Sequence, residues 1–137
     1  SALDLSSEII VGFYLPLRQT GQSSAFSRVM RPQGVALPIL NMAVWMERDE
    51  QVIRDIHIAI GPSGPVPFRA TLVEKELIGK PPDLETLKKA KEAIHQSIKF
   101  RSSAMRASAV YRHHLSEVLL EEVIGKAWQR AFELEAV

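Results

Sequence analysis

Cysteine is absent from this chain of 137 residues. That absence excludes disulfides, thiolate ligands for a metal or an iron–sulfur cluster, and cysteine nucleophiles within the chain. It also fits a reducing compartment, so we expect a cytoplasmic location. An excess of charge of one sign is missing too, because 17 Lys and Arg oppose 16 Asp and Glu, for a formal net charge of +1. Without a strong overall field, we expect no nucleic-acid partner.

Long hydrophobic runs are also missing. The longest one, residues 35–46, is interrupted by Pro38 and Asn41 and is too short to cross a bilayer. The first eight residues contain no basic stretch followed by an apolar one, which is not the pattern of a signal peptide. We therefore expect no membrane partner. The composition, 46% hydrophobic and 24% charged, is ordinary for one globular domain.

Proline and glycine divide the chain into two unlike halves. All eight prolines and six of the seven glycines precede Asp83, whereas only Gly125 follows it. The first half therefore favours strands and loops, and the second half favours helices. A strand-rich half followed by a helical half predicts an α+β fold.

Alternating side chains predict the first strands. Residues 8–15 alternate along an apolar stretch and predict a strand that ends at Pro16. Residues 18–24 are polar and predict a loop, and residues 25–30 predict a short strand. Residues 31–34, with the sequence Arg-Pro-Gln-Gly, predict a turn.

A β-hairpin is the clearest local feature. Residues 37–47 are apolar and aromatic, and residues 52–60 follow after a short polar turn. In the second segment, Ile56, Ile58 and Ile60 share one side. We expect the two segments to pair with one face buried. They would form the centre of a small, mainly antiparallel sheet of three or four strands, with helices packed mostly on one face.

Three helices are predicted, one just before Asp83 and two after it. Residues 71–78 form two turns that Gly79 closes. Asp83 is a suitable N-cap for a helix over residues 84–98, and a last helix covers residues 106–133. The expected inner stripe of the second helix is Leu84, Leu87, Ala90 or Lys91, and Ile94. The expected stripe of the last helix is Leu115, Leu119, Leu120, Val123, Ile124, Ala127, Trp128 and Ala131.

No arrangement of side chains predicts catalysis or a metal site. The histidines are His57, His95, His113 and His114. They lack the i, i+4 spacing with which two histidines chelate a metal on a helix. The serines Ser102, Ser103 and Ser108 lack the Gly-x-Ser-x-Gly setting of an activated nucleophile. The glycine-containing loop at residues 61–65 is neither a dinucleotide fingerprint nor a P-loop, and its prolines remove amide donors.

One run of basic residues stands out in the helical half. It comprises Lys99, Arg101, Arg106, Arg112 and two histidines. No acidic residue lies between Glu92 and Glu117. Such a run can bind phosphates or nucleic acid, or it can face an acidic surface of another domain. Because the net charge is nearly neutral, we favour an interdomain salt-bridge surface.

A smaller basic pair brackets the predicted turn. Arg28 and Arg31 lie on either side of the turn's entrance, beside an expected sheet edge. A guanidinium group suits the polar edge of a cofactor or an anion, because it donates several hydrogen bonds in a fixed plane. The alternative is that both side chains lie in solvent.

Five stretches occur in an order typical of one family. They are Glu-Ile-Ile-Val-Gly-Phe-Tyr-Leu-Pro at 8–16, Arg-Val-Met-Arg-Pro-Gln-Gly-Val-Ala at 28–36, Ile-His-Ile-Ala-Ile-Gly at 56–61 with Pro-Val-Pro-Phe-Arg-Ala at 65–70, Leu-Ile-Gly-Lys at 77–80, and Arg-Ala-Ser-Ala-Val-Tyr-Arg-His-His-Leu at 106–115. Together they resemble the C-terminal domain of the FAD-binding subunit of molybdenum hydroxylases, the carbon monoxide dehydrogenase flavoprotein and xanthine dehydrogenase family. Two departures concern aspartates that many members carry, one near residues 33–35 and one near residues 102–105. Both are absent here.

The resemblance implies an assignment for the whole chain. It makes residues 1–20 a strand and linker from the end of the FAD-binding domain. Residues 21–137 then form the flavoprotein C-terminal domain, and the chain is a single domain overall. The implied cofactor is FAD in the intact subunit, with Arg28 and Arg31 turned toward it. No cofactor is expected in this fragment, because the family's pyrophosphate-binding motifs lie in a region that this chain lacks.

The resemblance also implies partners and a role. The partners would be the FAD-binding domain of the same subunit and the molybdopterin and iron–sulfur subunits of an oxidoreductase. The domain would pack beside the flavin and stiffen an electron-transfer complex, with no catalytic residue of its own. The alternative is a free-standing protein-interaction module of the same fold, without flavin or a redox role.

Overall fold

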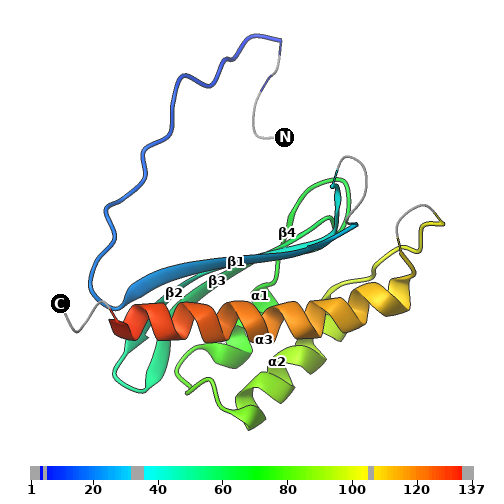
Figure 1. Cartoon of the computed structure of the whole chain (residues 1–137). Coiled ribbons are helices and arrows are strands. Elements are labelled where there is room, and N and C mark those ends of the chain that lie inside the picture. Colours follow the sequence, from blue (N-terminus) through cyan, green and yellow to red (C-terminus); the bar gives the residue numbers. More distant parts are fainter. Residues whose placement is uncertain (1–3, 5, 32–35, 105–106, 134–137) are drawn as a thin grey trace.

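The computed structural model describes residues 4, 6–31, 36–104 and 107–133. Within these residues, a four-stranded antiparallel sheet is followed by three helices (Figure 1). The elements are β1 (Gln22–Met30), β2 (Pro38–Asp49), β3 (Val52–Gly61), β4 (Phe68–Arg69), α1 (Thr71–Leu77), α2 (Leu84–Ser97) and α3 (Ala109–Glu133). The strands are ordered β1-β2-β3-β4, so each strand pairs with its neighbour in sequence. The α+β prediction is confirmed.

The predicted hairpin forms the centre of the sheet. Strands β2 and β3 pair from Asn41 opposite Gly61 to Asp49 opposite Val52. Between them, Glu50 takes a left-handed conformation with a φ of 50°, which lets the chain reverse tightly. The hairpin and its alternation are therefore confirmed.

The buried face of this sheet carries the core. Its residues on β2 and β3 include Leu40, Met42, Val44, Met46, Ile56, Ile58 and Ile60. Helix α3 crosses this face over β1 and β2, α1 lies against β3, and α2 packs on both α1 and α3 (Figure 1). The prediction that the helices pack mostly on one face is confirmed.

The stripe of α3 supplies most of the opposing surface. Seven of its eight predicted members are buried, and Trp128 is half-buried against the core. The stripe runs nearly the length of the helix because a three-to-four-residue apolar spacing keeps one side in contact. The predicted start at residue 106 lies outside the described residues, and the helix begins at Ala109.

The ends of α1 and α2 follow the predicted capping pattern. The Thr86 amide donates to Asp83 Oδ1 at 2.8 Å, so Asp83 is the N-cap of α2. Gly79 follows the C-cap residue Ile78 of α1 and has a φ of 76°, a conformation that favours glycine. The predicted inner position of Leu84 is wrong. It is 86% exposed in the first turn of α2, whereas Thr86 is buried in its place.

Two strand boundaries differ from the sequence interpretation. Residues 8–15 are not a strand, since they run extended and exposed without a pairing partner among the described residues. An isolated strand has no hydrogen-bond partners for its peptide groups, so alternation of side chains alone does not stabilise it. Strand β1 begins at Gln22 rather than at residue 25, because Ser23 and Ser24 pair with Met46 and Trp45. The predicted turn lies mostly outside the described residues, at 32–34.

Candidate functional site

The second face of the sheet is not covered by the described helices. Phe26 on β1, Trp45 on β2 and His57 on β3 belong to this open face. The Trp45 and His57 rings are in contact, with centroids 5.1 Å apart and an angle of 43° between their planes. Phe26 is 56% exposed. An aromatic row on an uncovered sheet is typical of a surface that another domain or protein covers.

Three hollows follow one another along the open face. The middle one has a volume of about 460 Å³ and includes Trp45, His57 and Arg69 in its lining. At one end of the face, a hollow of about 450 Å³ lies between Trp45 and the extended residues Leu15, Pro16 and Leu17. The third lies at the other end of the face, where β2 and β3 meet the loop after β3.

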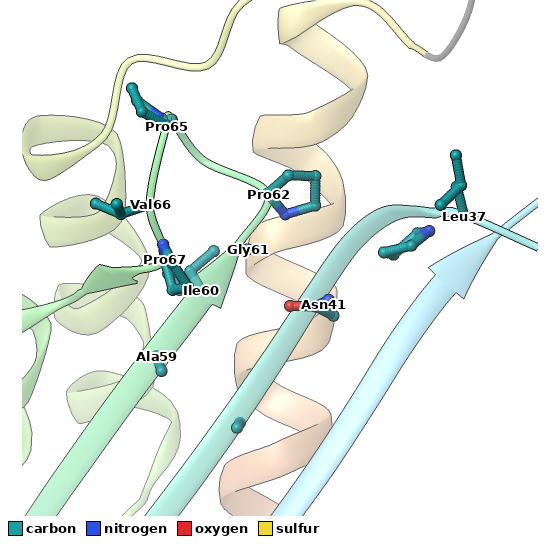
Figure 2. Close-up of a pocket in the computed structure, with 12 residues that line it drawn as sticks. Leu37, Asn41, Ala59, Ile60, Gly61, Pro62, Pro65, Val66 and Pro67 are labelled. Carbon is teal, nitrogen blue, oxygen red and sulfur yellow. The ribbon is translucent and has the colours of Figure 1, made fainter. Parts of the chain in front are cut away.

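Figure 2 shows this third hollow, an apolar pocket of about 390 Å³. Its lining includes Leu37, Asn41, Ala59, Pro62, Val66 and Pro67. Asn41 supplies the only side-chain amide in the described lining, so it can orient a polar edge within an otherwise apolar site. Gly61 lies opposite Asn41, and a Cβ atom there would come within 3.1 Å of Asn41 Oδ1. Glycine at this position therefore keeps room for the Asn41 side chain.

The two arginines predicted to bind the cofactor occupy different places. Arg28 lies on β1 directly opposite Asn41, and its exposed side chain shares the open face with that residue. Arg31 follows the end of β1 and is exposed. Neither arginine is part of the described lining of the pocket, although Arg28 is one strand away from its wall. Asn41, by contrast, was missed, because an isolated Asn in an apolar run carries no recognisable motif.

A buried carboxylate at the β3 edge was also missed. Glu74 on α1 is only 5% exposed, and its Oε1 accepts hydrogen bonds from the Ile58 amide at 2.8 Å and from Arg69 Nε at 3.0 Å. This hydrogen bond to Glu74 raises the pKa of the Arg69 guanidinium. Strand β4 pairs only with Ala59 and Ile60 of β3, and the Glu74 carboxylate accepts from the next amide along β3, that of Ile58. The sequence spacing does not predict this contact, because it depends on how α1 packs against β3.

The histidines do not assemble a reactive centre in the described structure. His95 on α2 contacts Glu117 on α3 through Nε2 and Oε1, and its ring stacks on His113 at 4.8 Å. Burial, followed by the charge of His95, lowers the pKa of His113. Among the described residues, no group of three or more His, Asp or Glu side chains could hold a metal ion. The arrangement joins α2 to α3 and leaves the open face as the candidate functional surface.

The fold is shared with large redox enzymes. The carbon monoxide dehydrogenase from Hydrogenophaga pseudoflava, in a form lacking the Mo-pyranopterin moiety, aligns with a TM-score of 0.76 and 22% identity. The reconstituted CO dehydrogenase from Oligotropha carboxidovorans aligns with 0.75 and 23%. In both cases the alignment covers 85% of this chain but 40% of the solved chain. Quinoline 2-oxidoreductase from Pseudomonas putida 86 gives 0.71 and 24%, covering 80% and 38%.

A family model identifies the domain itself. Residues 24–127 match the CO dehydrogenase flavoprotein C-terminal domain. The chain therefore belongs to this family, as its five sequence stretches indicated. Among curated protein sequences, none matches the chain. None of the described helices has the length and apolarity that a membrane span requires.

Proposed function

We propose that the chain serves as the C-terminal, structural domain of the FAD-carrying subunit of a cytoplasmic molybdenum-containing oxidoreductase. The family match over residues 24–127 carries this proposal. The fold shared with CO dehydrogenase and quinoline 2-oxidoreductase chains supports it. The chain spans about 40% of the length of the CO dehydrogenase chains it matches, so most of such a subunit lies outside this domain. The cofactors of the whole enzyme carry its chemistry, and this domain positions them.

In this proposal, the open face of the sheet packs against the FAD-binding domain of the same subunit. The aromatic pair Trp45 and His57 offers an apolar contact area, and three hollows along the face can receive side chains. Residues 8–17 also support packing of the open face against the FAD-binding domain. They leave the domain beside Trp45 and expose Val11, Tyr14 and Leu17 almost completely. Such a segment gains hydrogen-bond partners if it pairs as a strand within the preceding domain, and residues 1–20 are proposed to be that strand and its linker.

Arg28 and Arg31 are proposed to face the flavin side of that interface. Arginine can donate to the carbonyl edge of a flavin, or it can orient a carboxylate that accepts from a flavin N–H group. The isolated chain is expected to bind FAD weakly, because a dinucleotide gains most of its affinity from a pyrophosphate cradle and a buried adenine pocket. If the purified chain keeps stoichiometric flavin through gel filtration, the weak-binding proposal is wrong.

The flavin contact is tested in the intact subunit. We expect Arg28→Ala and Arg31→Ala to lower its FAD content or slow flavin reduction, whereas Arg54→Ala should change neither. Arg54 is a fair control because it is exposed and pairs with Glu47 near the opposite end of β3. Unchanged FAD content and reduction in both arginine variants would remove the contact role.

The overall function is tested by isolating the native protein. A subunit of the proposed kind should contain FAD and purify together with molybdenum and iron–sulfur clusters, all of which can be measured as stoichiometric contents. A chain that purifies alone, without flavin, molybdenum or iron, would contradict the proposal and favour an independent interaction module.

A further inference from the structure

A polar hollow shares the loop that closes the apolar pocket. It has a volume of about 460 Å³ and is lined by loop residues 62–65 together with Lys99, Arg101 and Arg112. Pro62 and Pro65, labelled in Figure 2, line both hollows, so the loop separates an apolar site from a basic one. No acidic side chain is among the described lining residues.

Arg112 is the buried member of this cluster. It is only 7% exposed, and its Nε is buried without a hydrogen-bond partner in the described part of the chain. Burying this Nε–H group without an acceptor costs free energy, since the water it loses is not replaced. The other buried arginine, Arg48, has partners for its guanidinium group. Arg48 donates through Nε to the Glu50 carbonyl oxygen, and its guanidinium lies 4.2 Å from the centre of the Trp128 ring.

The surroundings of Arg112 add further positive charge. Lys99 and Arg101 are exposed at the mouth of the hollow. Arg112 itself lies in the first turn of α3, which contains no acidic residue. The Ala109 and Tyr111 amides at this end already donate to Ser102 Oγ and Ser108 Oγ, so side chains rather than free amides supply the positive charge of the hollow. All the charged side chains in the described lining of this hollow are therefore positive.

We propose that this hollow is an oxyanion site that binds phosphate, either free or as the phosphoryl group of a small metabolite. Arg112 acts as the anchor through its terminal nitrogens, because these two donors match phosphate oxygens and Nε itself is buried out of reach. Lys99 and Arg101 hold the outer oxygens. The Ser63 hydroxyl also lies in this lining, but it already donates to the Ile60 carbonyl oxygen at 3.2 Å, so the basic side chains supply the donors. The sequence alone favoured a salt-bridge surface for this basic run, and the largely buried Arg112 at a hollow without acidic lining residues instead favours a small ligand.

The proposal is tested with the whole 137-residue chain. Inorganic phosphate and pyrophosphate are titrated at constant ionic strength set with sodium chloride, and the Tm and the Kd by calorimetry are measured. Phosphate also stabilises proteins generally by exclusion from their surface, so the wild type must be compared with a variant. We expect Arg112→Met to weaken phosphate binding about tenfold or more and to lose the specific rise in Tm. Lys88→Gln, which removes an exposed lysine of α2, should keep both.

Two further measurements separate binding from folding. In chloride alone, Arg112→Met should melt at or above the wild-type Tm, because it removes a largely buried cation whose Nε–H lacks an acceptor. The double variant Lys99→Gln with Arg101→Gln changes only exposed side chains, and we expect it to weaken phosphate binding severalfold at an unchanged Tm in chloride. Tighter binding of pyrophosphate than of phosphate would assign a phosphorylated metabolite, and equal binding would assign free phosphate.

One result would overturn the proposal. If phosphate shifts the Tm equally in the wild type, in Arg112→Met and in the double variant, the hollow binds no oxyanion of its own. The basic residues would then be a surface for acidic side chains of another domain.

Discussion

The two faces of one sheet have opposite characters. On the helix-covered face, Leu40, Met42 and Ile58 have at most 1% of their surface exposed. On the open face, Phe26 and His57 are exposed and Trp45 is half-buried, although they belong to the same strands. Because successive strand residues point to opposite sides, one sequence can build a core and an interaction surface at once. Stability is therefore concentrated on one face, and the proposed function on the other.

The largest effect is expected in the helix layer. Leu120 on α3 has no exposed surface, and Leu120→Ala should lower the free energy of unfolding by about 3 kcal/mol, since it removes apolar contact and leaves a cavity. Urea unfolding measures this change. The matched control is Leu84→Ala on α2, where the leucine is 86% exposed and the expected change is below about 0.5 kcal/mol. Equal losses in the two variants would contradict the described packing.

The buried carboxylate at the sheet edge should have the next largest effect. Glu74→Ala leaves the Ile58 amide without its acceptor, so we expect a loss of about 2 kcal/mol in the free energy of unfolding. Glu76→Ala on the same helix breaks only the exposed ion pair with Lys80 and should cost about 0.5 kcal/mol or less. A negligible loss for Glu74→Ala would show that water replaces the carboxylate.

The cap of α2 gives a smaller, pH-dependent effect. The Thr86 backbone hydrogen bond lowers the pKa of Asp83 below its ordinary value of 3.8. A carboxyl group with a depressed folded-state pKa stabilises the fold fully above its unfolded-state value, and this stabilisation is lost as the pH falls through the folded-state value. Asp83→Ala should therefore lower the Tm at neutral pH, and the difference from wild type should shrink below pH 3.8. A difference that stays constant across that range would exclude the charged cap.

The smallest effect on stability is expected on the open face. Trp45→Thr keeps a residue suited to strands and removes a half-buried ring, so we expect a loss below about 1 kcal/mol in the isolated chain. The same variant should impair assembly of the intact subunit, measured as its yield and FAD content. A large loss of stability in the isolated chain would mean that Trp45 belongs to the core.

Local patterns predicted much of the fold because their partners are close in sequence. The alternation of Ile56, Ile58 and Ile60, the Asp83 cap and the stripe of α3 all express short-range geometry. Residues 8–15 show the same alternation, yet they form no strand, because pairing depends on a partner that the described residues do not supply. Ser23 could not be recognised as a strand residue, since its burial depends on a hydrogen bond from its hydroxyl to the Ala127 carbonyl oxygen.

The candidate site was less predictable than the fold. Arg28 was singled out and lies on the open face, whereas the pocket beside it depends on Asn41 and on a loop brought over the end of β3. Arg112 was recognised as part of a basic run, but its burial became evident only from the packing of α3 beside loop 62–65. Such sites depend on long-range contacts, which a single sequence does not specify.

Chemical modification of histidine tests the proposed role of the open face most directly. Both His57, on that face, and His114, on α3, are exposed in the described structure. Diethylpyrocarbonate should therefore modify both residues in the isolated chain, and mass spectrometry can follow each rate separately. In the intact flavoprotein subunit, our account predicts strong protection of His57 relative to the isolated chain, because the FAD-binding domain covers it. An unchanged rate at His57 in the intact subunit would contradict the account.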